Sequence, residues 1–144
     1  MCSIQTPWSY WAYDMDAITH EMAIKYHILR YIAGEMTKLH MVGGTFYKPM
    51  FFEFPNDEKS FEAAPQLNIM LGSALKVSIQ STNSSSALYE TDFYFPSGTW
   101  CQIFDKNGSR VNGCFDQKEP GMVTLPSGKG DFGLHLREGF IIPH

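Results

Sequence analysis

The sequence predicts an α/β fold at its N-terminal end and an all-β fold behind it. Two observations indicate this order. Residues 16–40 have apolar side chains at three-, four- and seven-residue steps, the period of one helical face, and a nearly continuous apolar run follows at residues 46–54. Beyond residue 80 the chain consists of short apolar runs separated by glycine- and proline-containing turns, a pattern typical of an antiparallel sheet or sandwich.

The composition is that of a globular protein. The chain has 144 residues, of which 44% are hydrophobic and 18% are charged, so it can bury a core. Its net charge of −4 provides no basic face for neutralising phosphates, and we expect no nucleic-acid partner. No apolar stretch reaches the roughly 20 residues that cross a bilayer. The N-terminus also lacks a basic segment followed by an apolar run, so we expect neither a membrane span nor a signal peptide within this chain.

The helical pattern predicts one long amphipathic helix at residues 16–40. Asp14 or Asp16 would cap its N-terminus, because a carboxylate there accepts free backbone N–H groups. Gly43-Gly44 would end the helix. Gly34, in its interior, is expected to mark a weak point or a close contact.

The apolar run at residues 46–54 predicts a strand covered on both faces, as in a parallel sheet. A helix followed by such a strand is half of a β/α repeat. Glu53 would lie inside this strand, and a buried carboxylate needs a partner, so we expect Glu53 to have a structural role.

The remaining pattern predicts a turn-like or helical segment at residues 66–72 and a half-exposed strand at residues 74–79. A surface loop is expected at residues 81–86. Further strands are expected at residues 88–95, 100–104, 121–125 and 133–136.

The three cysteines, Cys2, Cys101 and Cys114, are too few and too widely spaced for a disulfide framework or a zinc site. We expect free thiols, with a Cys101–Cys114 bridge as the alternative in an oxidising compartment. Asn83 and Asn107 each begin an N-x-S/T sequon in a turn-like segment, so both are predicted glycosylation sites. The sequons shift the expectation slightly toward a secreted or lumenal protein.

No metal site or cofactor site is expected from the remaining polar residues. The five histidines are too dispersed to form a metal cluster: His20, His27, His40, His135 and His144. Four aromatic residues crowd together before the predicted helix and could stack on sugars, although packing is the favoured interpretation: Trp8, Tyr10, Trp11 and Tyr13.

Three segments have distinctive motifs. They are Pro49-Met50-Phe51-Phe52-Glu53-Phe54-Pro55-Asn56-Asp57, Phe95-Pro96-Ser97-Gly98-Thr99-Trp100 and Arg137-Glu138-Gly139-Phe140-Ile141-Ile142-Pro143. In sequence, order and spacing these segments resemble glycoside hydrolase family 31, the α-glucosidase family. Weaker matches extend the resemblance over nearly the whole chain.

The resemblance implies two domains. Residues 1–73 would form the end of a (β/α)8 TIM barrel: its penultimate helix, its eighth strand at residues 49–54 and its last helix. Residues 74–144 would form an incomplete proximal C-terminal domain, an antiparallel β-sandwich. The implied reaction is the hydrolysis of terminal α-linked glucose with retention of configuration and without a cofactor.

The resemblance places both catalytic carboxylates and a substrate-binding histidine N-terminal to Pro7. We therefore expect no catalytic residue here, and the chain alone should be inactive. Asp14-Met15-Asp16 superficially resembles the family's nucleophile motif, but its flanking residues do not match. Lys48 stands where the family usually has arginine, Ile79 replaces a proline and Cys101 replaces an aromatic residue, so the chain resembles a divergent member.

Two functions follow as expectations. The first is a fragment or subunit of a retaining α-glucosidase that closes and supports the barrel, with the remaining glycosidase polypeptide as its partner and an α-glucoside as the substrate of the assembly. The second is a noncatalytic structural or interaction module derived from such an enzyme. The resemblance implies the secretory pathway, with a lysosomal or secreted protein.

Overall fold

The computed structural model describes residues 12–62, 67–79, 88–104, 110–128 and 132–143. In chain order the elements are α1 (Ala12–His27), α2 (Leu29–Val42), β1 (Tyr47–Pro49), α3 (Met50–Glu53), the 3-10 helix η2 (Glu58–Phe61), β2 (Asn68–Leu71), β3 (Leu75–Ile79), β4 (Leu88–Phe95), β5 (Gly98–Phe104), β6 (Arg110–Gln117), β7 (Gly121–Gly128) and β8 (Phe132–Arg137).

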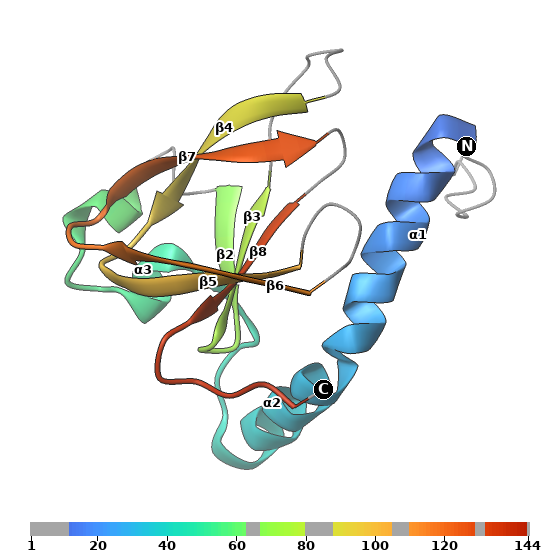
Figure 1. Cartoon of the computed structure of the whole chain (residues 1–144). Helices are drawn as coiled ribbons and strands as arrows, with labels where there is room; N and C mark the ends of the chain where they lie inside the picture. The colour runs from blue at the N-terminus through green and yellow to red at the C-terminus, as the bar shows by residue number, and fades with distance from the viewer. Residues whose placement is uncertain (1–11, 63–66, 80–87, 105–109, 129–131, 144) are drawn as a thin grey trace, which may run out of the picture.

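Two antiparallel sheets form the body of the chain (Figure 1). The larger sheet has six strands in the order β1-β2-β3-β8-β5-β6, and the smaller sheet pairs β4 with β7. All strand pairs among the described residues are antiparallel. The antiparallel architecture expected for the C-terminal part is therefore confirmed, whereas the described residues contain no part of a parallel barrel.

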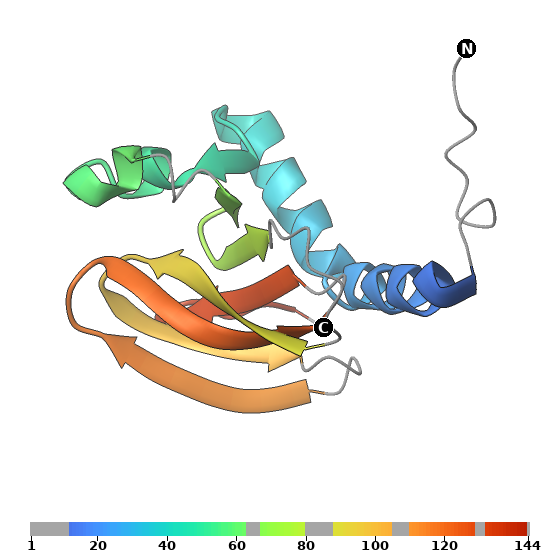
Figure 2. The same cartoon turned by 90° about the horizontal axis from the view of Figure 1, so that it is seen from above.

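The six-stranded sheet has a buried cluster on each face. On one face Leu71, Leu75 and Leu134 pack with residues of the helices, including Ile24 and Tyr31. The helices α1 and α2 form an elbow beside the sheets (Figure 2).

The opposite face packs on the small sheet and on α3. Met70 and Trp100 of the large sheet lie there in one cluster with Met50 of α3 and with Phe93 and Phe95 of β4. Because neighbouring residues of a strand point to opposite faces, β2 and β5 contribute to both clusters, whereas β3 and β8 contribute apolar residues to the helical face. The large sheet is consequently a middle layer, and the half-exposed strand expected at residues 74–79 is covered on both sides.

The predicted long helix is two helices that meet at Ile28. This residue has φ −97° and ψ 5°, outside the helical region, although backbone hydrogen bonds continue across it from Ile28 N to Ile24 O and from Ile32 N to Ile28 O. The chain bends here rather than at Gly34, whose missing side chain would touch nothing within 4 Å. The bend lets residues of both helices reach the same core cluster.

The predicted caps of this helix had different outcomes. The N-cap prediction for Asp14 or Asp16 is wrong, because α1 already begins at Ala12. The glycine stop is confirmed: α2 ends at Val42, and Gly43 follows with a positive φ of 80° and donates its N–H to the Leu39 carbonyl.

The eighth strand predicted at residues 49–54 is wrong. Only Tyr47–Pro49 is extended, and Met50–Glu53 forms the single helical turn α3, closed by a hydrogen bond from Phe54 N to Met50 O. The helical turn buries Met50 and leaves Phe52 59% exposed, so the apolar run is not covered on both faces. The continuous apolar pattern was misleading because it does not distinguish a buried strand from a short helical segment.

The helical or turn-like segment predicted at residues 66–72 is also wrong, since Asn68–Leu71 is strand β2. It forms a hairpin with β3, in which Leu71 lies opposite Leu75. Because this pairing joins β2 to β3, the six-stranded sheet crosses the expected boundary after residue 73. The division into two domains stays a prediction.

The later strand predictions are confirmed, with small changes at their ends. Strand β4 coincides with the prediction, and β3, β5, β7 and β8 differ from theirs by a few residues. The polar strand β6 was not predicted, and it forms the edge next to β5. The loop expected at residues 81–86 lies outside the described residues.

The turn between β2 and β3 is locked to helix α2 by a tyrosine hydroxyl. Tyr31 donates a hydrogen bond of 2.7 Å from its hydroxyl to the Leu71 carbonyl and accepts one of 3.2 Å from Ala74 N–H. The turn needs a glycine, because Gly72 has φ +62° and an added Cβ would lie 2.4 Å from the Tyr31 hydroxyl oxygen. Helix and hairpin therefore hold each other in place.

We predict that Gly72→Ala lowers the free energy of unfolding by about 2 kcal/mol or more, through the left-handed backbone and the displaced tyrosine. Gly34→Ala is the matched control, because it lies in an open helical position where alanine should stabilise by about 0.5–1 kcal/mol. Urea unfolding of both variants measures the difference. Equal effects of the two substitutions would contradict this account of the turn.

Candidate functional site

The clearest polar constellation is a carboxylate held between two cations. Glu53 accepts a hydrogen bond from Lys48 Nζ at 2.9 Å on Oε2 and one from Arg137 Nη1 at 3.1 Å on Oε1. Lys48 also donates to the Ser73 hydroxyl at 3.0 Å. These side chains are 17–29% exposed, so the ion pairs are partly shielded from water. We call Lys48, Glu53 and Arg137 the Glu53 cluster.

Three elements bring the Glu53 cluster together. Lys48 lies on β1, Glu53 is the last residue of α3, and Arg137 is the last residue of β8. The Arg137 backbone N–H donates to the Ala74 carbonyl at 2.8 Å, which fixes the end of β8 beside the start of β3. Its guanidinium also lies 4.6 Å from the centroid of the Phe54 ring. The expected structural partner for Glu53 is thus confirmed, although Glu53 lies in a helical turn and not in a strand.

An open pocket of about 410 Å³ adjoins the Glu53 cluster and includes Lys48. Its walls come from β1, α3, η2 and β2, and are mainly apolar. The lining residues are Tyr47, Lys48, Pro49, Met50, Phe51, Ser60, Asn68 and Ile69.

A second polar group is buried between the two sheets. Lys76 is fully buried, and its amine donates to Asn68 Oδ1 at 2.8 Å and also contacts the Ser78 hydroxyl. His135 lies directly opposite Lys76 on the neighbouring strand and is 1% exposed. Burial lowers the pKa of Lys76 well below its usual value. Burial, reinforced by the nearby Lys76, lowers the pKa of His135 to about 3.

A half-exposed strand at residues 74–79 would leave its polar side chains in water, but Lys76 of this strand is fully buried. The covering small sheet is formed by β4 and β7, which lie far away in the sequence, so the local pattern could not show it. Asn68 and Ser78 lie opposite each other on β2 and β3, and Ser78 is two positions from Lys76 on the same face of its strand. These polar residues were the available sign that this face carries polar groups.

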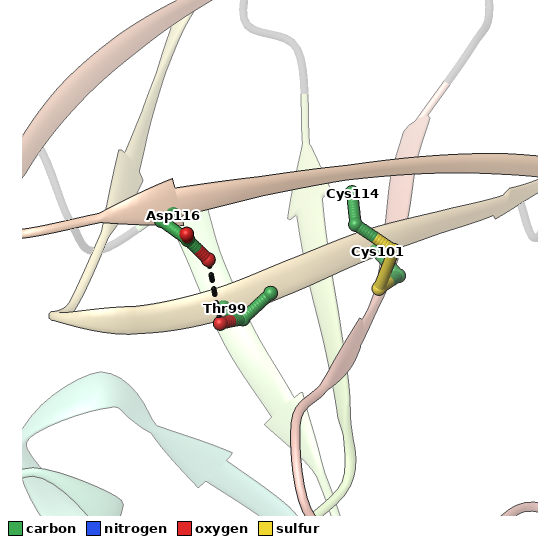
Figure 3. Close-up of a disulfide and its surroundings, with 4 residues drawn as sticks. All are labelled: Thr99, Cys101, Cys114 and Asp116. Atoms are coloured by element: carbon green, nitrogen blue, oxygen red, sulfur yellow. Dashed lines mark hydrogen bonds between the residues drawn. A yellow bond between two sulfur atoms is a disulfide. The ribbon is translucent and has the colours of Figure 1, made fainter.

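A disulfide joins Cys101 of β5 to Cys114 of β6 (Figure 3). The two residues are directly opposite each other with a Cα–Cα distance of 4.0 Å, which brings their side chains together. The expectation of free thiols is therefore wrong for this pair, and the alternative bridge is the one observed. Beside it, the Thr99 hydroxyl donates to Asp116 Oδ1 at 2.7 Å. Both contacts fasten the edge strand β6 to β5.

Several candidate residues from the sequence lie outside the described residues: Cys2, Trp8, Tyr10, Trp11, Asn83, Asn107 and His144. The side chains of Tyr13, Asp14 and Asp16 are likewise outside the description. Of the remaining histidines, His27 contacts the Phe104 ring at 5.5 Å, and only His135 lies within the buried polar row between the sheets. In the part of the chain that the structure describes, no three His, Cys, Asp or Glu side chains are placed to hold a metal ion.

The chemistry of the Glu53 cluster is that of support. A retaining glycosidase needs one carboxylate as the nucleophile and a second, protonated carboxyl group about 5–5.5 Å away. Both Glu53 oxygens are instead bonded to cations of other elements, so this carboxylate links β1, α3 and β8 together. None of the described helices is long and apolar enough to cross a membrane.

This fold and this site define a class: an antiparallel β-domain with attached helices, in which the charged groups link elements together. The sequence model described as the glycosyl hydrolase family 31 C-terminal domain matches residues 43–142. The chain therefore belongs to glycoside hydrolase family 31.

Individual relatives agree with this assignment. The chain is 27% identical to the lysosomal alpha-glucosidase of Mus musculus over 150 residues, covering 96% of this chain and 15% of the relative. It is 31% identical to the intestinal sucrase-isomaltase of Suncus murinus over 127 residues, which cover 86% of this chain and 6% of that protein.

A solved structure shows the same fold. The family 31 dextranase of Flavobacterium johnsoniae superposes with a TM-score of 0.76 at 19% identity over 95% of this chain and 15% of that chain. In each of these comparisons the chain spans less than one sixth of the protein that it matches.

We predict that Glu53→Gln lowers the free energy of unfolding by about 2 kcal/mol, because it leaves Lys48 and Arg137 partly buried without a carboxylate. Lys38→Gln is the matched control. Lys38 is 61% exposed and lies 3.8 Å from Glu35, so its loss should cost less than about 0.5 kcal/mol. Denaturant unfolding compares them, and a Glu53→Gln variant as stable as Lys38→Gln would refute the structural role.

Replacing both Cys101 and Cys114 with serine should lower the free energy of unfolding by about 2–3 kcal/mol, because the bridge restricts the unfolded chain over a separation of 13 residues. A reductant should destabilise the natural protein by a similar amount and leave the double variant unchanged. Thermal unfolding with and without dithiothreitol provides the measurement. A reductant effect on the double variant would show that another group is responsible.

Proposed function

We propose that this chain is a fragment or subunit of a retaining α-glucosidase of family 31. In this role it supports and helps to close the catalytic barrel, and the two catalytic carboxylates come from polypeptide outside these residues. The assembled enzyme would hydrolyse terminal α-linked glucose through a covalent glucosyl-enzyme intermediate.

Relatives support the reaction class. Curated proteins that match more than four fifths of this chain include alpha-glucosidases and an alpha-xylosidase. Because the chain spans 13–15% of these relatives, most of each of them has no counterpart here. This difference in length fits a supporting part of a larger catalytic unit.

The observation that favours a supporting role most strongly is an apolar surface at the β1 edge. In the described sheet β1 is the terminal strand, so one of its sides has no strand beside it. Tyr47, Phe52 and Phe61 are each more than half exposed in and near this strand. Adjacent to them is the pocket that Tyr47, Met50 and Phe51 line.

An exposed strand edge next to large apolar side chains is unfavourable in water, and proteins usually cover such edges. We assign the remaining glycosidase polypeptide as the occupant of this surface. Lys48 belongs both to the pocket wall and to the Glu53 cluster, which would give that contact a rigid base.

The proposed location is the secretory pathway, as a lysosomal or secreted protein. The Cys101–Cys114 disulfide supports an oxidising compartment. One relative is a lysosomal alpha-glucosidase. Glycosylation at Asn83 and Asn107 remains part of this proposal.

The test uses the intact natural protein that contains these residues and a chromogenic α-glucoside. Phe52→Asp should lower activity at least about tenfold or lower the melting temperature by several degrees, because it introduces a charge into the covered surface. Met122→Asp is the matched control, since Met122 is 48% exposed on β7, away from this edge, and should have little effect.

Two results would overturn the proposal. If both variants behave as the natural protein does, the β1 edge is not covered. If the intact natural protein cleaves no α-glucoside, the enzyme assignment fails and the noncatalytic module is favoured instead.

A further inference from the structure

The space between the two sheets contains two basic side chains where an apolar core is expected. Lys76 and His135 are paired across strands β3 and β8, and both point to the face that β4 covers. The Lys76 amine lies 3.9 Å from the centroid of the Phe95 ring, and the His135 ring meets the same phenylalanine edge-on at 4.9 Å. One residue of the small sheet thus covers both bases.

The neighbours of His135 offer no counter-charge. From β4 and β6 it meets the rings of Phe95 and Phe115, and from β5 its cross-strand neighbour is the uncharged Gln102. The charged group that acts on it from β3 is Lys76, a base of the same sign when protonated. Within the described residues neither ring nitrogen of His135 makes a hydrogen bond of good geometry, and the Gly133 backbone, which acts to raise the pKa of His135, is outweighed by burial and by Lys76.

Among the described residues, the partners of Lys76 are neutral. Asn68 and Ser78 approach its amine from β2 and β3, and Phe95 lies against it from β4. The carboxylate of Glu53, which faces Arg137 further along β8, is already bonded to two cations. Within the part of the chain that the structure describes, a proton added to this inter-sheet pair therefore has no nearby anion to balance it.

The His135 ring also has little space in which to move. A Cβ added to Gly133 would lie 3.0 Å from His135 Cε1, so the ring is held tightly against the backbone of its own strand. A charged imidazolium could gain water only if the small sheet moved away from the large one.

We propose that Lys76 and His135 form an acid-sensitive latch, which holds the two sheets together at neutral pH and releases them when acid protonates the buried pair. The latch does not depend on the glycosidase assignment.

The direction in which pH shifts the equilibrium between the closed and open sheets follows from proton binding. The pKa of His135 is about 3 in the closed structure, whereas an exposed histidine has a pKa near 6.5. Between these values the open state binds one more proton than the closed state, so closing becomes less favourable as the pH falls through this window. Histidine alone then favours opening by about 20-fold between pH 7 and pH 5. The lowered pKa of Lys76 acts in the same direction.

Hydrogen–deuterium exchange of the intact natural protein tests the latch, with protection factors corrected for the intrinsic pH dependence of exchange. Protection of β3 and β8 amides should fall at least about 20-fold from pH 7 to pH 5. In the Lys76→Met/His135→Phe double variant the same change should be below about 3-fold.

His135→Gln serves as a second variant, because it keeps Lys76 and its partners and removes only the titrating ring. It should remove the roughly 20-fold loss of protection that the histidine contributes between pH 7 and pH 5. Lys38→Met and His40→Gln, at exposed positions of α2, should retain the full pH dependence. The proposal is overturned if the natural protein keeps its protection at pH 5, or if His135→Gln shows the same pH dependence as the natural protein.

Discussion

The structure depends on one carboxylate, Glu53, which joins segments that lie 84 residues apart in the sequence. Through Lys48 it is bonded to β1, and through Arg137 it is bonded to the end of β8. Both ends of the chain's described β-structure therefore meet at one partly buried charge. Without the carboxylate, two partly buried cations would remain unpaired with it, which is why a replacement there should cost more than the loss of a surface ion pair.

The six-stranded sheet is covered on both faces, and this explains the placement of the other special groups. On the helical face, the Tyr31 hydroxyl fixes the β2–β3 turn, and Gly72 leaves room for it. On the other face the small sheet covers Lys76 and His135. The Tyr31 contact joins helix to sheet through hydrogen bonds, whereas Lys76 and His135 lie between the sheets without a counter-charge among the described residues.

Sequence reasoning succeeded where local signals agree with tertiary structure. The turn residues and alternating runs located most of the later strands, although Pro126-Ser127-Gly128 lies within strand β7 and not in a turn. The expectation that Glu53 needs a partner was also correct. The motif containing Arg137 was recognised by its family resemblance, but nothing local in the sequence linked it to Glu53, because that contact is made by the folded sheet.

The failures have physical causes. An apolar run suits a short helical turn as well as a strand, and Met50–Glu53 forms such a turn, from whose end Glu53 bonds to Lys48. Lys76 looked exposed because the strands that cover it are distant in sequence. Cys101 and Cys114 looked unpaired because strand β6, which places one opposite the other, is polar and gave no strand signal.

The central claim is that a family 31 polypeptide outside these residues covers the β1 edge. Hydroxyl-radical footprinting of the intact natural protein tests it most directly, with Met122 as the exposed reference. The account predicts that Tyr47 and Phe52 are oxidised far more slowly in the native protein than after denaturation, whereas Met122 reacts readily in both. Rapid native oxidation of Tyr47 and Phe52 would contradict it.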